Sequence, residues 1–142
     1  MSRRLKGVLF ALSVLALPAA AVADDITGQQ DFLCTAVQVN LCTDDGKCVS
    51  ENPWEVNVPQ FIEVNLKDKK LSTTKASGEN RTTPIRTQVN EGGFLYLQGV
   101  EGGRAFSFVI EEKSGDASIA VAADGKTVTV FGACTPIVSP AK

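Results

Sequence analysis

The sequence contains no histidine, and this absence removes several classes of enzyme at once. A Ser-His-Asp triad, a Cys-His pair and a histidine-ligated zinc hydrolase each need an imidazole side chain. Paired carboxylates remain, but Asp44-Asp45 and Glu111-Glu112 are neighbours in sequence, so they point apart on a strand or lie on a turn. We therefore expect a protein that is not an enzyme, with no catalytic residues and no cofactor.

Long apolar runs are also missing, except for residues 7–17 near the start of the chain. That run follows the basic stretch Ser2-Arg3-Arg4-Leu5-Lys6 and precedes the small residues Ala21-Val22-Ala23. This order is typical of a secretory signal peptide, whereas a membrane-spanning helix needs about 20 apolar residues. We expect residues 1–23 to be removed near Ala23, which predicts a periplasmic or secreted protein without stable membrane insertion.

Basic charge is scarce in the part of the chain that would remain. Removal of residues 1–23 takes away three basic residues and no acidic one, which leaves 119 residues with 11 basic side chains, 16 acidic side chains and a net charge of −5. An acidic surface repels phosphate backbones, so we expect no nucleic acid as a partner. A chain of this length forms one domain. We place a polar, loose lead-in at residues 24–31, a β domain at residues 32–135 and a tail at residues 136–142.

Only four cysteines are present, Cys34, Cys42, Cys48 and Cys134. An even number of cysteines in an exported chain indicates disulfides, and four cysteines allow three pairings. The turn-forming stretch between Cys42 and Cys48 favours a bond between these two, which leaves Cys34 for Cys134. The spacing fits no common zinc pattern, so we expect no metal.

The chain repeats short segments in which apolar and polar residues alternate, separated by turn residues such as Asp124-Gly125. A period of two is the pattern of a strand with one buried face, and such strands pack in antiparallel sheets. Pro53 and Pro59 bracket a loop or edge segment. We expect eight strands, at residues 32–41, 61–66, 71–75, 85–89, 94–100, 104–111, 117–121 and 126–131, with a doubtful ninth at residues 48–50.

Eight antiparallel strands in sequence order fit an all-β, up-and-down meander that closes into an eight-stranded barrel. Closure removes exposed sheet edges, and it brings the first and last strands together, as a Cys34–Cys134 bond requires. A two-sheet β-sandwich is the alternative. The interior of such a barrel is either filled or holds one small ligand, and the short chain favours a filled one. Candidate inward residues are Leu33, Val37, Ile62, Val64, Leu95, Leu97, Phe106, Phe108, Ile119, Val121, Val128 and Val130.

Three segments resemble a family of small exported bacterial proteins of uncharacterised function. They are Arg81-Thr82-Thr83-Pro84-Ile85, residues 97–108 (LQGVEGGRAFSF) and Val130-Phe131-Gly132-Ala133-Cys134-Thr135. The resemblance covers residues 32–135 and implies a bacterial envelope setting, but no activity. The likeness of the expected barrel to lipocalins is one of fold alone.

Six residues are candidates for binding. Arg86 and Arg104 could hold an anion by forked hydrogen bonds if both pointed into the barrel, although strand parity places only Arg104 on the face of Phe106 and Phe108. The alternative is one surface arginine and one at the rim. Trp54 and Tyr96 are candidate anchors or lids, with core or rim positions as the alternative. Asp44 and Asp45 lie in the Cys42–Cys48 hairpin.

Two functions fit these residues, and we expect the first, with the second as its alternative. In the first, the protein is an interaction module, of inhibitor type, that binds an unknown protein partner through its loops, since loops on a rigid scaffold often carry function. In the second, the barrel carries a small apolar or anionic ligand. Asp44, Asp45 and Trp54 should matter in the first case, and Phe106 and Phe108 in the second.

Overall fold

A computed structural model of the chain describes residues 26–77 and 80–137. This part forms ten β-strands and two short 3-10 helices, with no α-helix, so the all-β prediction is confirmed. The predicted signal peptide at residues 1–23 and most of the predicted tail lie outside the described residues. The strands are β1 (Phe32–Thr43), β2 (Cys48–Glu51), β3 (Phe61–Asn65), β4 (Lys70–Thr73), β5 (Thr82–Pro84), β6 (Thr87–Glu91), β7 (Phe94–Glu101), β8 (Arg104–Glu111), β9 (Asp116–Ala123) and β10 (Lys126–Pro136), and the helices are η1 (Pro53–Val56) and η2 (Lys75–Ser77).

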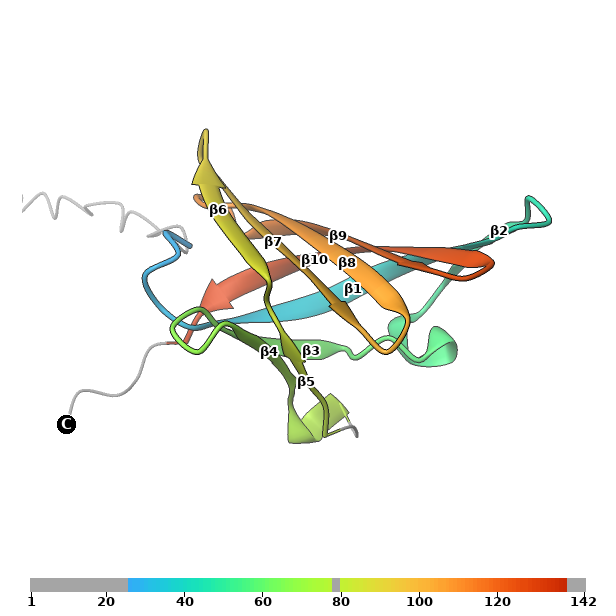
Figure 1. The fold of residues 1–142 in the computed structure, drawn as a ribbon, viewed down its shortest axis with the longest axis horizontal. Coiled ribbons are helices and arrows are strands. Elements are labelled where there is room, and N and C mark those ends of the chain that lie inside the picture. Colours follow the sequence, from blue (N-terminus) through green and yellow to red (C-terminus); the bar gives the residue numbers. More distant parts are fainter. Residues whose placement is uncertain (1–25, 78–79, 138–142) are drawn as a thin grey trace, which may run out of the picture.

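Nine of the strands form one antiparallel sheet that curls into a half-barrel (Figure 1). Their order across the sheet is β5-β4-β3-β1-β10-β9-β8-β7-β6. β2 lies off this path and pairs with one half of β1, so the two strands project from the molecule as a hairpin (Figure 1). The predicted up-and-down meander, with its first and last strands side by side, is therefore confirmed.

The two edges of the half-barrel, β5 and β6, follow each other in the chain and are separated only by Ile85 and Arg86. β5 pairs with β4 and β6 pairs with β7, but in the described part of the chain no ladder joins β5 to β6. Figure 1 shows the chain running from β5 directly into β6. The two edges are therefore joined at this seam by the chain itself and not by a ladder between them, because one bent segment supplies both edges.

The strand count also differs from the prediction of eight. β2 confirms the doubtful strand near residues 48–50. β5 escaped prediction because it has only three residues and ends on Pro84, which cannot donate a ladder hydrogen bond. The segment between Pro53 and Pro59, predicted as a loop or edge segment, contains η1.

Both predicted disulfides are present. Cys34 on β1 is bonded to Cys134 on β10, at directly opposite positions of the ladder. Cys42 is bonded to Cys48 across the β1–β2 hairpin. Two disulfides in one small domain suggest an oxidising environment of the extracellular type.

β1 contains a bulge, where its register with β10 shifts between Ala36 and Gln38. A bulge inserts one extra residue, so the side chains beyond it change faces. The even-numbered residues of β1 are buried before the bulge, and Val39 is buried after it. The prediction that Leu33 and Val37 face the core is therefore wrong. Val37 is 67 % exposed, whereas Val39 is 0 % exposed.

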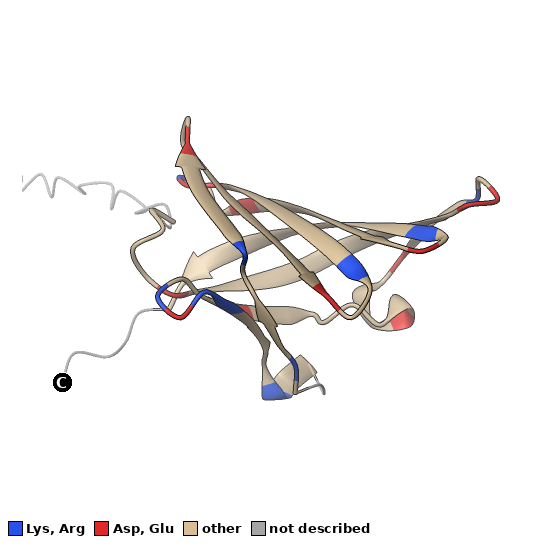
Figure 2. Ribbon diagram, in the orientation of Figure 1, with Lys and Arg blue, Asp and Glu red and all other residues tan. Residues whose placement is uncertain are grey.

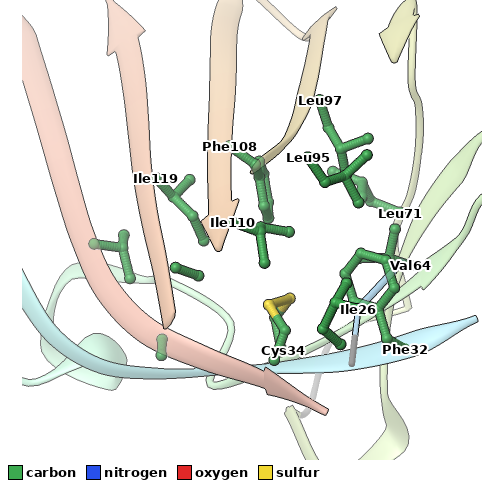
Figure 3. Packing of buried hydrophobic residues seen from close by; sticks show 14 of the residues in the cluster. Ile26, Phe32, Cys34, Val64, Leu71, Leu95, Leu97, Phe108, Ile110 and Ile119 are labelled. Carbon is green, nitrogen blue, oxygen red and sulfur yellow. A yellow bond between two sulfur atoms is a disulfide. The ribbon is translucent and has the colours of Figure 1, made fainter. Parts of the chain in front are cut away.

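Apolar side chains fill one end of the half-barrel (Figure 3). The described residues include no buried polar or charged side chain, so this core is held by apolar contact and not by buried ion pairs. Of the predicted inward residues, Val64, Leu95, Leu97, Phe108, Ile119 and Val130 are buried, while Ile62, Phe106, Val121 and Val128 are partly buried against the core. The large side chains with the least exposure are Phe32, Val39, Pro53, Val64, Leu95, Leu97 and Ile110.

Both ends of the domain are tied to the half-barrel. Ile26 is buried, and its backbone N–H donates to the carbonyl oxygen of Glu112 at 2.6 Å. The N–H of Ile137 donates to the carbonyl oxygen of Asp31 at 2.9 Å. The described part of the lead-in is thus attached to the half-barrel at Ile26, while Thr27, Gln29 and Gln30 are exposed.

Candidate functional site

The open end of the half-barrel contains a cavity of about 110 Å³. Its wall combines side chains from both sides of the curled sheet. An engineered apolar cavity of about 150 Å³ is large enough to bind benzene, so this cavity has room for one small apolar group. The expected filled interior thus holds for one end of the half-barrel only. The apolar side chains of the wall are Ile62 and Leu71 from β3 and β4, Phe106 and Phe108 from β8, and Ile119 and Val121 from β9.

Two aromatic rings on β8 give the cavity a firm wall. Phe106 and Phe108 lie on the same face of β8, and their rings meet edge to face with centroids 5.8 Å apart. Such an arrangement is favourable because the positive edge of one ring meets the negative face of the other. Gly99 lies beside Phe106 on β7, where an added Cβ would overlap the Phe106 ring and the carbonyl oxygen of Pro84. Glycine at this position therefore lets β5 approach β7 closely.

Polar side chains lie at the mouth of the cavity. Thr83 Oγ1 donates to Glu101 Oε2 at 2.5 Å. Arg104 Nη2 lies 3.7 Å from the same carboxylate oxygen, which makes an ion pair but exceeds hydrogen-bond length. A guanidinium group has five N–H donors, and within the described part of the chain those of Arg104 make no hydrogen bond. Arg104 is 37 % exposed, so its donors can reach both solvent and a bound molecule.

The structure places the two candidate arginines, Arg86 and Arg104, in different surroundings. Arg104 lines the cavity with Phe106 and Phe108, as strand parity predicts. Arg86 is exposed and lies outside the cavity, near Thr87 and Gln98, and its N–H donates to the Gln98 carbonyl oxygen. The two side chains therefore do not converge on one anion. Arg81 also lines the cavity.

Tyr96 lies away from the cavity, on the outer face of β7. Its neighbours Leu95 and Leu97 are buried in the interior, so the side chain between them points outward. Its ring centroid lies 6.3 Å from that of Phe94, two residues earlier on the same face. Tyr96 is therefore not a lid over the cavity.

Trp54 is 64 % exposed, on the short helix η1. The helix begins with a capping box in which Glu55 Oε2 accepts hydrogen bonds from the backbone N–H of Asn52 at 2.9 Å and from its side-chain amide at 3.0 Å. The backbone hydrogen bond, followed by the side-chain one, lowers the pKa of Glu55 below its ordinary value. Trp54 lines a separate groove with Pro59 and Ala76, so it stands on an ordered support but outside the cavity.

Asp44 and Asp45 lie at the tip of the β1–β2 hairpin, which Figure 1 shows projecting from the half-barrel. The side chain of Lys47 donates to Asp45 Oδ2 at 2.5 Å, and the hydroxyl of Thr43 donates to Asp45 Oδ1 at 2.6 Å. The contact with Lys47, followed by that with Thr43, lowers the pKa of Asp45. The backbone N–H of Asp44 donates to the Gly125 carbonyl oxygen at 3.0 Å. Asp45 thus already has partners within its own turn.

Sequence reasoning missed several residues around the cavity. Glu101 and Thr83 meet only because β5 passes beside β7, and no local pattern signals that contact.

A Ser-x-x-Lys spacing, as in some hydrolases, is present at residues 72–75, and Ser72 lines the cavity. That spacing brings the amine to the hydroxyl on one turn of a helix. Here Ser72 lies in β4 and Lys75 begins η2, so the pair does not share a helical turn.

No protein-family model matches the sequence, and no curated protein matches it. The resemblance to a family of small exported bacterial proteins therefore stays a prediction. Within residues 26–77 and 80–137, no helix is long and apolar enough to span a bilayer. The same residues contain no group of three or more cysteine, aspartate or glutamate side chains placed to hold a metal ion.

Proposed function

We propose that this protein is an exported, non-enzymatic binding protein that holds a small amphiphilic molecule in its half-barrel. An apolar group of the ligand lies in the cavity, and an anionic group lies at the mouth beside Arg104. One observation carries this proposal: an apolar cavity opens beside an arginine whose N–H donors make no hydrogen bond within the described residues.

The two parts of the site contribute comparable free energies. Burial of about 100 Å² of apolar ligand surface stabilises a complex by about 2.5 kcal/mol. A hydrogen bond to a charged group adds about 1.5–3 kcal/mol. Together these terms correspond to a dissociation constant of about 0.1–1 mM for a one-ring anion. The natural ligand binds more tightly if it also contacts Arg81 or Thr83 at the mouth.

Binding without catalysis agrees with the residues present. The chain has no histidine, and its four cysteines are all in disulfides.

Binding of benzoate, with benzyl alcohol as its neutral analogue, tests the proposal. Two-dimensional NMR with benzoate should move the signals of Phe108 and Ile119. Arg104→Gln should weaken benzoate at least fivefold and leave benzyl alcohol unchanged, because only the anion uses the guanidinium group. Val121→Phe should fill the cavity and weaken both compounds. Val100→Phe, a change at an exposed position of β7, is the matched control and should affect neither.

Two results would overturn the proposal. One is the absence of shifts at cavity residues with either compound up to several times the expected dissociation constant. The other is equal loss of both compounds in Arg104→Gln, which would mean that the arginine shapes the cavity and does not bind an anion. Native mass spectrometry of protein purified from its own host complements this test, since a retained ligand adds mass that is lost on denaturation.

Export rests on the segment at residues 1–23 together with the disulfides. We propose that this segment is a signal peptide and that the protein resides in the periplasm or outside the cell. Amino-terminal sequencing of the protein from the envelope fraction should begin at Asp24. A chain that begins at Met1 in that fraction contradicts cleavage at Ala23.

A second candidate function is a protein-interaction module of inhibitor type, and the exposure of Trp54 favours it. An ordered, exposed tryptophan is a frequent centre of binding energy in protein interfaces. If this function operates, Trp54→Ala should abolish partner binding, and Asp44→Asn with Asp45→Asn should weaken it. Benzoate binding should be unaffected by both sets of changes. Retained partner binding in Trp54→Ala contradicts this candidate.

A further inference from the structure

The outer wall of the half-barrel carries a row of apolar side chains on the side opposite the cavity. Cross-strand pairing aligns four of them, Val89, Tyr96, Val109 and Phe131, on β6, β7, β8 and β10, with the small polar residue Ser118 of β9 between the last two. Phe94 lies next to this row, with its ring centroid 6.3 Å from that of Tyr96. The solvent face of an antiparallel sheet is usually polar, and an exposed apolar patch with a polar rim often marks an interaction site.

This row contains a hollow of about 480 Å³, which we call the outer hollow. Phe94 and Phe131 line it, with 36 % and 43 % of their side chains exposed. Its floor is low because Ser118, which lies between Val109 and Phe131 in the ladder, is small. Gly132 contributes only backbone to this floor, because it alternates with Phe131 along β10 and an added Cβ there would meet the carbonyl oxygen of Thr35 on β1.

Two carboxylates, Glu111 and Asp116, line the outer hollow, while no lysine or arginine does. Figure 2 shows acidic residues at this end of β6, β8 and β9 and no charged residue in the middle of β7–β10. Lys113 lies in the turn between β8 and β9 but does not line the outer hollow. Glu111 Oε2 accepts a hydrogen bond from the Ser114 hydroxyl at 2.6 Å, and the described residues include no cation paired with either carboxylate. Aromatic faces beside carboxylates favour an organic cation, which both groups attract.

We propose that the outer hollow docks a lysine or arginine side chain presented by an apolar segment of a partner protein. The methylene stem lies between Phe94 and Phe131, and the cation faces Glu111 and Asp116. Long basic side chains bind in this way because their stems are apolar and their heads are charged. The neighbouring residues Val89, Tyr96 and Val109 contact the apolar part of the partner segment.

This surface is independent of the ligand cavity, although both use the same strands. Residues alternate along a strand, so Phe94, Val109, Ser118 and Phe131 point outward where Leu95, Phe108, Ile119 and Val130 point inward. A bound partner and a bound small molecule therefore lie on opposite faces of one wall. The two sites also prefer groups of opposite charge. The mouth of the cavity favours an anion, and the outer hollow favours a cation.

Site-specific photo-cross-linking of the full-length protein in its own host tests the proposal. A photoreactive residue replaces Ser118 at the floor of the outer hollow, and a matched one replaces Val100 on the same face near the far end of β7. Mass spectrometry should place the Ser118 adduct within a few residues of a lysine or arginine on another protein. In the background of Glu111→Gln with Asp116→Asn, the yield should fall at least tenfold. Glu63→Gln with Asp124→Asn is the charge control and should leave the yield unchanged.

Three outcomes overturn this docking proposal. The first is an adduct with a second copy of this chain, which would make the row a self-association surface. The second is an adduct on a segment without basic residues, or a yield that does not depend on Glu111 and Asp116. The third is a yield at Ser118 no higher than that at Val100. Circular dichroism and thermal unfolding of the same variants report whether the half-barrel is intact, so failure here does not depend on failure of the ligand proposal.

Discussion

Cys34 on β1 and Cys134 on β10 lie directly opposite each other, although 100 residues separate them in the sequence. Their bond joins the two strands that the chain makes first and last. Because β1 and β10 are neighbours inside the sheet, the bond lies within the curled wall and not at its edges. Both cysteines are buried, so the sulfur atoms also belong to the core in Figure 3.

The two disulfides should contribute unequally to stability. The chain-entropy relation assigns up to about 4.7 kcal/mol to a closed loop of about 100 residues, and roughly 2 kcal/mol to a loop as short as that of Cys42 and Cys48. Replacement of Cys34 and Cys134 by alanine should therefore lower the free energy of unfolding by more than replacement of Cys42 and Cys48. Urea unfolding followed by circular dichroism measures both. Equal losses would contradict the loop-length argument.

The bulge in β1 predicts opposite responses at two valines. Val39→Asn places an amide without a partner in the core and should cost about 3 kcal/mol or more. Val37→Asn should change the free energy of unfolding by less than about 0.5 kcal/mol, because this side chain lies in water. Thermal or urea unfolding distinguishes them. A larger loss at Val37 than at Val39 would mean that the register of β1 differs from that described.

Gly99 should not tolerate a methyl group. Gly99→Ala forces the ring of Phe106 and the chain at Pro84 away from β7, and over-filling of this kind costs about 1–3 kcal/mol. The neighbouring change Val100→Ala is the control, because Val100 is exposed and its removal should be nearly neutral. The Gly99→Ala protein should also bind benzoate more weakly, since Phe106 lines the cavity. Unchanged stability and binding would show that β5 can move away without cost.

The capping box of η1 should respond to acid. The folded state lowers the pKa of Glu55, so its stabilising contribution is complete above the ordinary glutamate pKa and is lost as the pH falls through the lowered value. NMR titration of the Glu55 carboxyl group, with the indole signal of Trp54 as a neighbouring reporter, follows this change. Asn52→Ala removes one side-chain donor and should raise the pKa toward its ordinary value. A Glu55 pKa at or above the ordinary value in the unaltered protein would contradict the capping box.

Much of the fold could be predicted because strand periodicity and turn residues are local properties of the sequence. The alternation over residues 104–110 predicts a strand, and Asp124-Gly125 predicts a turn. Neither prediction depends on distant residues. The bulge at Val37 could not be predicted, because it depends on pairing with Phe131 and Gly132 nearly 100 positions away. The pairing of the cysteines could be inferred only because two of them flank a turn.

The candidate site was predicted less completely, for a related reason. The alternation of side chains between the two faces of β8 was enough to place Arg104 beside Phe106 and Phe108. The contacts of Arg104 with Glu101, and of Glu101 with Thr83, depend on how closely β5 approaches β7. No local pattern predicts that Phe94 and Phe131 line one surface, because β8 and β9 lie between their strands, β7 and β10, in the sheet. Binding surfaces that cross a sheet are invisible to patterns read along one strand.

The seam between β5 and β6 gives the molecule an almost circular strand order. Phe32 at the start of β1 lies opposite Pro136 at the end of β10, so the natural ends of the domain are adjacent, while the free sheet edges are joined by Ile85 and Arg86. A circular permutant follows directly, with a short linker from Pro136 to Phe32 and new termini between Ile85 and Arg86. In that chain the strand order of the half-barrel would run from one edge to the other in simple sequence, and β1 and β10 would become an ordinary hairpin.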